Sequence, residues 1–245
     1  MSTIQRKIGS LLARVLTKPH RNYERFSVLT REQLDESLLP GDLILVEGNN
    51  RVSTVIKYLT QSTWSHVCMY VGVDDKGEGV LVEADMVEGV IRSPLSKYVG
   101  YNVRICRAAN LTEEDRKAVI EFCITRLGHQ YDTRNILDLV RYLLPIPPVP
   151  AKYRRHLIAL GSGDPTKAVC STLIAQAFQS IKYPILPQLR QVSEGDVPAQ
   201  CDEDLLESRH FSHFTPRDFD LSPFFEIIKP TIKGNFNYKK IRWFS

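Results

Sequence analysis

The sequence predicts an α+β domain in which a small antiparallel sheet packs against helices. Residues 38–107 contain short β-rich runs separated by turn residues, whereas most of the remaining 245-residue chain has helical or loop-like patterns. A third observation is an apolar helical pattern at residues 169–178, which comes late in the chain, after the strands. We therefore expect the strands of the sheet to come first along the chain and a helix from a distant part of the sequence to cover the sheet.

Composition narrows the class of protein. The hydrophobic content of 43% and the charged content of 24% are ordinary for a globular domain. A net charge of +4 is too small to indicate a nucleic-acid partner. The five cysteines form no C-x-x-C pair, so we expect neither a zinc site nor a disulfide framework. We also expect that the protein uses no cofactor and works in a reducing compartment.

Residues 1–18 form a basic amphipathic pattern that ends at Pro19. Such a helix either docks its apolar stripe on its own domain or lies on an anionic membrane surface. We find no signal-peptide pattern and no apolar run long enough to span a bilayer. The expectation is a cytoplasmic protein, with peripheral contact to the inner membrane face through residues 1–18 as the alternative. We divide the chain into an N-terminal segment, residues 1–37, which contains the amphipathic helix and a lead-in, and one domain, residues 38–245.

The strands of the predicted sheet follow from turn residues and apolar runs. Pro40, Gly41 and Asp42 form a turn before a continuous apolar run at 43–46, which is typical of a buried strand. A helix is expected at 52–59. Further strands are expected at 64–72, 80–85, 89–92 and 102–107.

The second half of the domain is mostly helix and loop. Thr112 is the predicted N-cap of a helix that continues to Gly128. A proline-rich, basic insertion around 143–168 could form a lid, a recognition loop or a solvated excursion. Residues 187–223 are interpreted as loop, and apolar runs follow at 224–228 and 238–244.

Cys170 is the first candidate for chemistry because it lies at the start of the 169–178 helix, after a glycine-rich loop. The unpaired N–H groups and the positive end of the helix dipole favour thiolate over thiol there. The same groups could receive the oxyanion formed when sulfur attacks a carbonyl. A buried structural cysteine is the competing interpretation.

His66 is the candidate base, since it opens a strand directly after a turn and can face a helix terminus packed on the sheet. Glu83 and Asp85 lie on the following strand and share one face by the two-residue period. Either carboxylate could accept the imidazole N–H, and we favour Glu83. The sequence thus indicates a cysteine, a histidine and an acid on three different elements.

These residues carry a resemblance to a known family. Gly41-Asp42-Leu43-Ile44, the run 64–72 with His66, Val82-Glu83-Ala84 and Cys170-Ser171-Thr172-Leu173-Ile174 resemble the circularly permuted NlpC-type cysteine hydrolases, the YiiX-like branch of the papain-like superfamily. In the ordinary order of that superfamily, the helix with the nucleophile precedes the sheet, and here it follows.

The resemblance implies a papain-like NlpC-type fold in permuted order. It implies Cys170 as nucleophile, His66 as base and Glu83 as orienting acid. Tyr131 resembles a tyrosine near the family's active site, with ordinary packing as the alternative, and we assign Trp64 and Ser65 with it to substrate binding.

The predicted function is a cysteine hydrolase that cleaves an amide bond in a peptide, a muropeptide or an N-acyl compound. One alternative is a membrane-associated lipid acyltransferase or thioesterase of the same architecture. Another is a non-catalytic binding module that retains the fold. The expected partners are small peptide or acylated substrates and no nucleic acid.

Overall fold

The computed structural model describes residues 27, 29–86, 88–130, 169–189, 206–207 and 209–230. Its framework is a six-stranded sheet in the order β4-β3-β2-β1-β5-β8, antiparallel throughout. The strands are β1 (Leu43–Val46), β2 (His66–Val73), β3 (Gly79–Asp85), β4 (Gly89–Pro94), β5 (Val103–Ala108) and β8 (Phe225–Ile228). A two-stranded ribbon joins β6 (Gln188–Leu189) to β7 (Leu206–Glu207).

The helices complete the fold. They are α2 (Arg31–Ser37), α3 (Arg51–Thr60), α4 (Glu113–Ile124), α7 (Val169–Ser180) and α8 (Pro216–Leu221), with short 3-10 helices η1 (Leu95–Tyr98) and η2 (Phe211–His213). The predicted α+β class, an antiparallel sheet packed against helices, is confirmed. The helix expected from Thr112 to Gly128 begins as predicted and ends earlier, at Ile124.

Strand β1 lies at the centre of the sheet, between β2 and β5. All four of its residues are buried, which explains why its sequence is continuously apolar and does not alternate. Leu43 and Leu45 face one side of the sheet, while Ile44 and Val46 face the other. The sheet is therefore covered on both faces.

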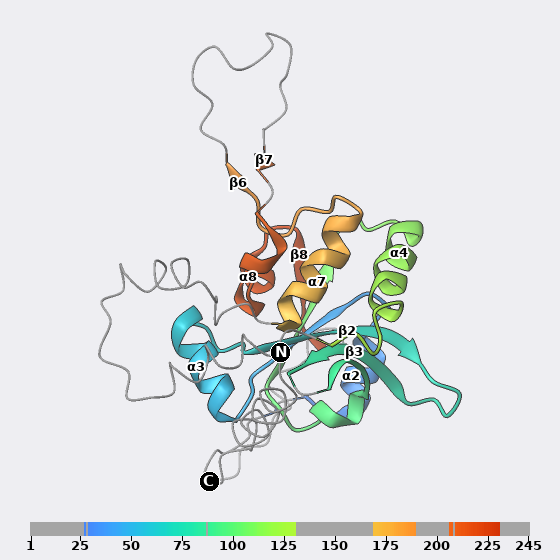
Figure 1. Ribbon diagram of the computed structural model, residues 1–245. Coiled ribbons are helices and arrows are strands. Elements are labelled where there is room, and N and C mark those ends of the chain that lie inside the picture. Colours follow the sequence, from blue (N-terminus) through green and yellow to red (C-terminus); the bar gives the residue numbers. More distant parts are fainter. Residues whose placement is uncertain are drawn as a thin grey trace, which may run out of the picture.

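The two faces carry different helices (Figure 1). The helices α4, α7 and α8 cover one face, where Val67, Met69 and Val82 pack against residues of α7. On the other face, Leu34 of α2 and Leu95 and Tyr98 of η1 pack against a second set of strand residues. That set comprises Ile44, Val46, Cys68, Tyr70, Leu81 and Ile105.

Two elements in the C-terminal part correct the sequence analysis. Residues 187–223 were expected to be loop, but they include α8, which starts with Pro216 and a capping box between Thr215 and Asp218. The next segment, β8, pairs with β5 and extends the sheet beyond the region 38–107. Both elements are short, and their stability depends on packing against residues distant in the sequence, such as Phe219 of α8 in the main core.

A glycine allows α4 to be tied to the sheet edge. Gly89 has a φ of +81°, and a Cβ there would lie 2.3 Å from the carbonyl oxygen of His129. This close approach permits the hydrogen bonds from Val90 N to His129 O and from Gly128 N to Val90 O, each 2.9 Å. The chain after α4 is thereby fixed beside the start of β4.

Several predictions fall outside the described residues. These are the amphipathic segment 1–18, the insertion 143–168, the apolar run 238–244 and Tyr131, and Cys201 also lies outside the described residues. Within the described ranges, no helix is both long and apolar enough to cross a membrane.

Candidate active site

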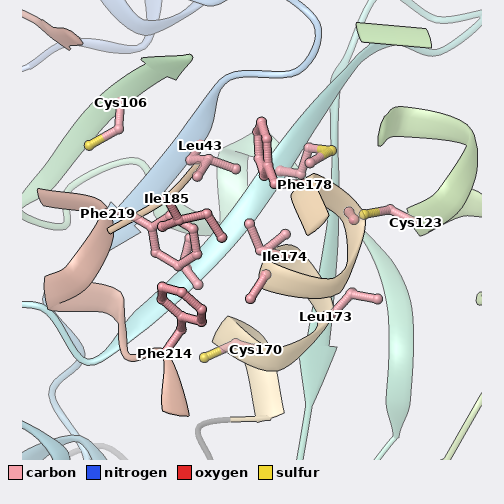
Figure 2. Close-up of a cluster of buried hydrophobic side chains, with 14 of the residues drawn as sticks. Leu43, Cys106, Cys123, Cys170, Leu173, Ile174, Phe178, Ile185, Phe214 and Phe219 are labelled. Carbon is pink, nitrogen blue, oxygen red and sulfur yellow. The ribbon is translucent and has the colours of Figure 1, made fainter. Parts of the chain in front are cut away.

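The helix α7 begins beside the sheet and carries Cys170 as its second residue. Leu173, Ile174 and Phe178 are fully buried, because the apolar face of the helix packs on β2 and β3. Figure 2 shows Cys170 at one end of the helix, with these three residues following along it. The same packing that stabilises the helix therefore fixes the position of the thiol, which is 5% exposed.

The strand β2 supplies His66 as its first residue, opposite Val46 of β1. The preceding residue, Ser65, fixes the strand start: its N–H donates to Val46 O at 3.1 Å, and its hydroxyl accepts from Gly48 N at 2.9 Å. The imidazole is therefore held at a strand end that is anchored to the end of β1.

Glu83 of β3 is the carboxylate that meets His66. Its Oε2 lies 2.6 Å from Nε2 of the imidazole, and the Glu83 side chain is only 2% exposed. Asp85, the other candidate, accepts the backbone N–H of Glu88 at 2.9 Å in the turn to β4. The structure thus pairs the histidine with Glu83, the carboxylate favoured from sequence.

The position of His66 at the strand end explains how it meets both partners. By alternation, His66 and Glu83 belong to the face that carries Tyr70 and η1, whereas α7 covers the opposite face. Because His66 is the first residue of β2, no earlier strand residue separates it from α7, and it interacts with both Glu83 and Cys170. A histidine in the middle of the strand could contact only one side.

The Cys170 thiol interacts with the side chain of His66 and with the backbone N–H of Val67. The Oγ of Ser171 lies 4.0 Å from the sulfur. Burial alone would raise the pKa of the Cys170 thiol, but the positive charge of His66 and these interactions lower the pKa below its ordinary value. Since Nε2 of His66 is engaged by Glu83, Nδ1 is the ring nitrogen left for the thiol.

The histidine shows the reciprocal shift. Burial alone would lower the pKa of His66, but the charges and hydrogen bonds of Cys170 and Glu83 raise it to about 10. Burial would raise the pKa of Glu83, yet His66 and Lys97 hold it well below its usual range. Both shifts favour the charged forms, a Cys170 thiolate and a His66 imidazolium, beside the Glu83 carboxylate.

The other described cysteines have the opposite electrostatics. Burial raises the pKa of Cys68 well above its usual value, and it raises the pKa values of Cys106 and Cys123 to about 12. All three lie in the hydrophobic core as uncharged thiols. Cys170 is thus the one cysteine of the described residues whose pKa is lowered.

The predicted substrate-binding residues have internal hydrogen-bond partners in the structure. Trp64 is 5% exposed, its indole Nε1 donates to Asp220 Oδ2 of α8 at 3.0 Å, and the Arg104 guanidinium lies over its ring. Ser65 accepts from Gly48 N as described above. These contacts fix the loop that leads into His66. The proposed contacts of Trp64 and Ser65 with substrate remain predictions, and Tyr131 lies outside the described residues.

Two further residues of the site were missed from the sequence. Lys97 Nζ lies 2.6 Å from Glu83 Oε1, and the hydroxyl of Tyr98 donates to Glu83 Oε2. Both come from η1, a single short turn with no periodic pattern, so no sequence signal linked them to Glu83. Among the described residues, no group of three or more histidine, cysteine or acidic side chains is arranged to hold a metal ion.

Comparisons with known proteins place this geometry in context. A search of curated proteins found no match. Among solved structures, the chain is similar to metalloprotein yiiX from Escherichia coli O157:H7, with 15% sequence identity, a TM-score of 0.47, and coverage of 79% of this chain and 97% of that one.

A family model described as permuted papain-like amidase enzyme, YaeF/YiiX, C92 family, matches residues 37–142. This range contains His66 and Glu83 and ends before Cys170. In the structure, strands β1 to β5 of the sheet precede α7 and β8 follows it. The strand that begins with His66 therefore comes before the helix that carries Cys170, which is the permuted order. Residues 37–142 of the chain are therefore similar to the permuted papain-like amidases.

Proposed function

We propose that this chain is a cysteine hydrolase that cleaves an amide bond through Cys170, His66 and Glu83. The observation that carries the proposal is the continuous contact from Cys170 to His66 and from His66 Nε2 to Glu83 at 2.6 Å, with the pKa of the thiol lowered. Substrates of this class are peptides, muropeptides and N-acyl compounds.

In the acylation step, the Cys170 thiolate attacks the carbonyl carbon of the amide and forms a C–S bond. The unpaired backbone N–H groups at the start of α7 can stabilise the developing oxyanion. As the tetrahedral intermediate collapses, the C–N bond breaks and the His66 imidazolium gives its proton to the leaving nitrogen. The products are an amine and a thioester on Cys170.

In the deacylation step, the now neutral His66 takes a proton from water, and the hydroxide attacks the thioester carbonyl. The C–S bond breaks, a carboxylic acid leaves, and the thiolate–imidazolium pair is restored. Glu83 holds the ring in one orientation throughout, since it accepts from Nε2 and leaves Nδ1 toward the sulfur.

The charge arrangement favours catalysis over a binding module that merely retains the fold. A binding role does not require a buried thiol with a lowered pKa, because an inert cysteine costs nothing and a buried charge costs free energy. The neighbouring core cysteines, which have raised pKa values, show how the same fold buries a thiol without activating it.

Selective alkylation provides the direct test of this proposal. At pH 7, iodoacetamide should modify Cys170 at least about tenfold faster than Cys68, Cys106 or Cys123, because thiolate is the reactive form. Peptide mass spectrometry of protein quenched at successive times gives the rate at each cysteine. Modification of Cys201 at the same rate as Cys170 would contradict the proposed nucleophile.

The role of Glu83 predicts a change in pH dependence. In Glu83→Gln the carboxylate charge that helps to raise the pKa of His66 is lost, so the imidazolium should lose its proton at a lower pH. The alkaline limb of p-nitrophenyl acetate hydrolysis should therefore move toward neutral pH, and the maximal rate should fall about tenfold to 100-fold.

Asp85→Asn is the matched control for this variant. It removes a carboxylate from the same strand, two residues away, that caps a turn and does not pair with His66. Its pH profile should overlay that of the wild-type protein. An equal displacement of the alkaline limb in both variants would show that Glu83 has no specific role.

A further inference from the structure

The 3-10 helix η1 presents two consecutive side chains to one buried carboxylate. Lys97 Nζ lies 2.6 Å from Glu83 Oε1, while the Tyr98 hydroxyl and His66 Nε2 both contact Oε2. The carboxylate therefore has three donors from two elements. Only one of them, His66, has a part in the proposed reaction steps.

We propose that Lys97 and Tyr98 are positioning residues of the site: Tyr98 orients the Glu83 carboxylate, and Lys97 balances its charge so that the Cys170–His66 ion pair forms at lower pH. This inference rests on the proposed function, because it assigns the two residues a role in activating the same thiol.

The charges alternate along the contact chain. Lys97 is positive, Glu83 negative, His66 positive and Cys170, as thiolate, negative, so every contact joins opposite charges and the sum is zero. Without Lys97 the cluster would carry an excess negative charge beside a carboxylate that is only 2% exposed. An added negative charge of this kind disfavours the thiolate and also binds the imidazolium proton more tightly.

Contacts with Glu78 and with the hydrophobic core hold η1 in place, so Lys97 and Tyr98 are preorganised to contact Glu83. Glu78 Oε1 accepts the backbone N–H of Ser96 at 3.1 Å, and Glu78 pairs in turn with Arg31 of α2. Leu95 is buried in the core. The Tyr98 ring, which is 7% exposed, packs with its centroid 6.0 Å from that of His66.

The other titratable groups near Glu83, Cys68 and Tyr98, carry no charge that could replace the positive charge of Lys97. Cys68 of β2 is influenced by the charges of Glu83, Lys97 and Cys170, but burial raises its pKa well above the usual value, so it remains a neutral thiol. Burial likewise raises the pKa of Tyr98, which stays a neutral donor. Lys97, with a side chain that is 40% exposed, is therefore the cation that offsets Glu83 on the side away from His66.

The test is the pH dependence of iodoacetamide alkylation at Cys170 in three variants of the full chain. Lys97→Met and Lys97→Gln both remove the charge, and Lys97→Arg keeps it. In the first two, the midpoint of the alkylation profile should move up by about one pH unit, which lowers the rate below the midpoint about tenfold. Lys97→Arg should retain the wild-type midpoint. A purely structural role would lower the melting temperature without moving the midpoint.

Lys57→Met is the matched control, because Lys57 also pairs with a glutamate, Glu47 at 3.2 Å, and has no contact with Glu83 among the interactions described. Its midpoint should equal that of the wild-type protein. Unchanged midpoints in both Lys97→Met and Lys97→Gln would overturn the inference while Cys170 stayed reactive. If the wild-type Cys170 itself reacts no faster than the core cysteines, the proposed function fails, which is a separate result.

For Tyr98, the corresponding variant is Tyr98→Phe, which keeps the ring and removes the donor to Glu83. The rate of p-nitrophenyl acetate hydrolysis should fall about tenfold with the melting temperature within a few degrees of the wild-type value. A rate equal to that of the wild-type protein would remove Tyr98 from the positioning pair.

Discussion

Replacement of Cys170 with alanine is expected to reduce hydrolysis by about 1,000-fold or more while the protein remains folded. The reason is that no other described thiol has a lowered pKa, and no second nucleophile contacts His66 in the interactions described. The measurement is hydrolysis of p-nitrophenyl acetate and of a panel of fluorogenic peptide and N-acyl amides. With the ester, the wild-type protein should also accumulate an acetyl adduct on Cys170, visible by mass spectrometry.

Cys106→Ala is the matched control for this result. It removes a thiol of the same core cluster that is fully buried and whose pKa is raised to about 12. This variant should lose some stability, because the substitution leaves a small cavity, and keep the activity of its folded fraction. An acetyl adduct in Cys170→Ala, or equal activity of the two variants, would contradict the assignment of the nucleophile.

The second large effect is expected in stability and concerns Asp42, in the glycine–aspartate turn before β1. Asp42→Asn should lower the free energy of unfolding by about 3 kcal/mol, because it removes the buried carboxylate charge that pairs with the largely buried Arg107 guanidinium. Arg107 donates to both oxygens of Asp42 at 2.8 and 2.6 Å, and the Asp42 side chain is 1% exposed. Asp42 also accepts the N–H of Leu39 at 2.8 Å. Urea titration followed by circular dichroism measures the change.

Asp42 lies at the opposite end of β1 from His66, since Asp42 precedes Leu43 at the start of β1 and His66 pairs with Val46 at its end. The alkylation rate of Cys170 in the folded variant should therefore match that of the wild-type protein. Glu36→Gln makes the same charge change at an exposed position of α2 and should alter stability by less than about 0.5 kcal/mol. A loss of stability in Asp42→Asn no larger than in this control would show that the buried ion pair contributes little.

The sequence alone was sufficient for the central strands and for the helix α7, and it indicated that Cys170 and His66 lie at the start of a helix and of a strand. The continuous apolar run of β1 and the apolar face of Leu173, Ile174 and Phe178 are strong local patterns, because burial on both faces or along one stripe requires them. The contact of Cys170 with His66 followed from two positions, a helix start and a strand start, that packing brings together.

The choice between Glu83 and Asp85 needed the structure. Both carboxylates lie on the same face of β3, and the two-residue period cannot distinguish them. The structure assigns Asp85 to the turn and Glu83 to His66, because η1 approaches β3 at Glu83 and supplies Lys97 and Tyr98 to a carboxylate that is otherwise buried.

The C-terminal elements depended mainly on tertiary contacts, although α8 also has a local capping box. The helix α8 and the strand β8 are each too short to show a reliable period, yet Asp220 of α8 holds Trp64 before His66, and β8 completes the sheet beside β5. The sequence by itself therefore determined which residue types stand at the ends of the helix and strand that form the site. Only the tertiary structure decided which carboxylate, which cation and which distant helix support them, because those contacts join residues whose separation along the chain follows no period.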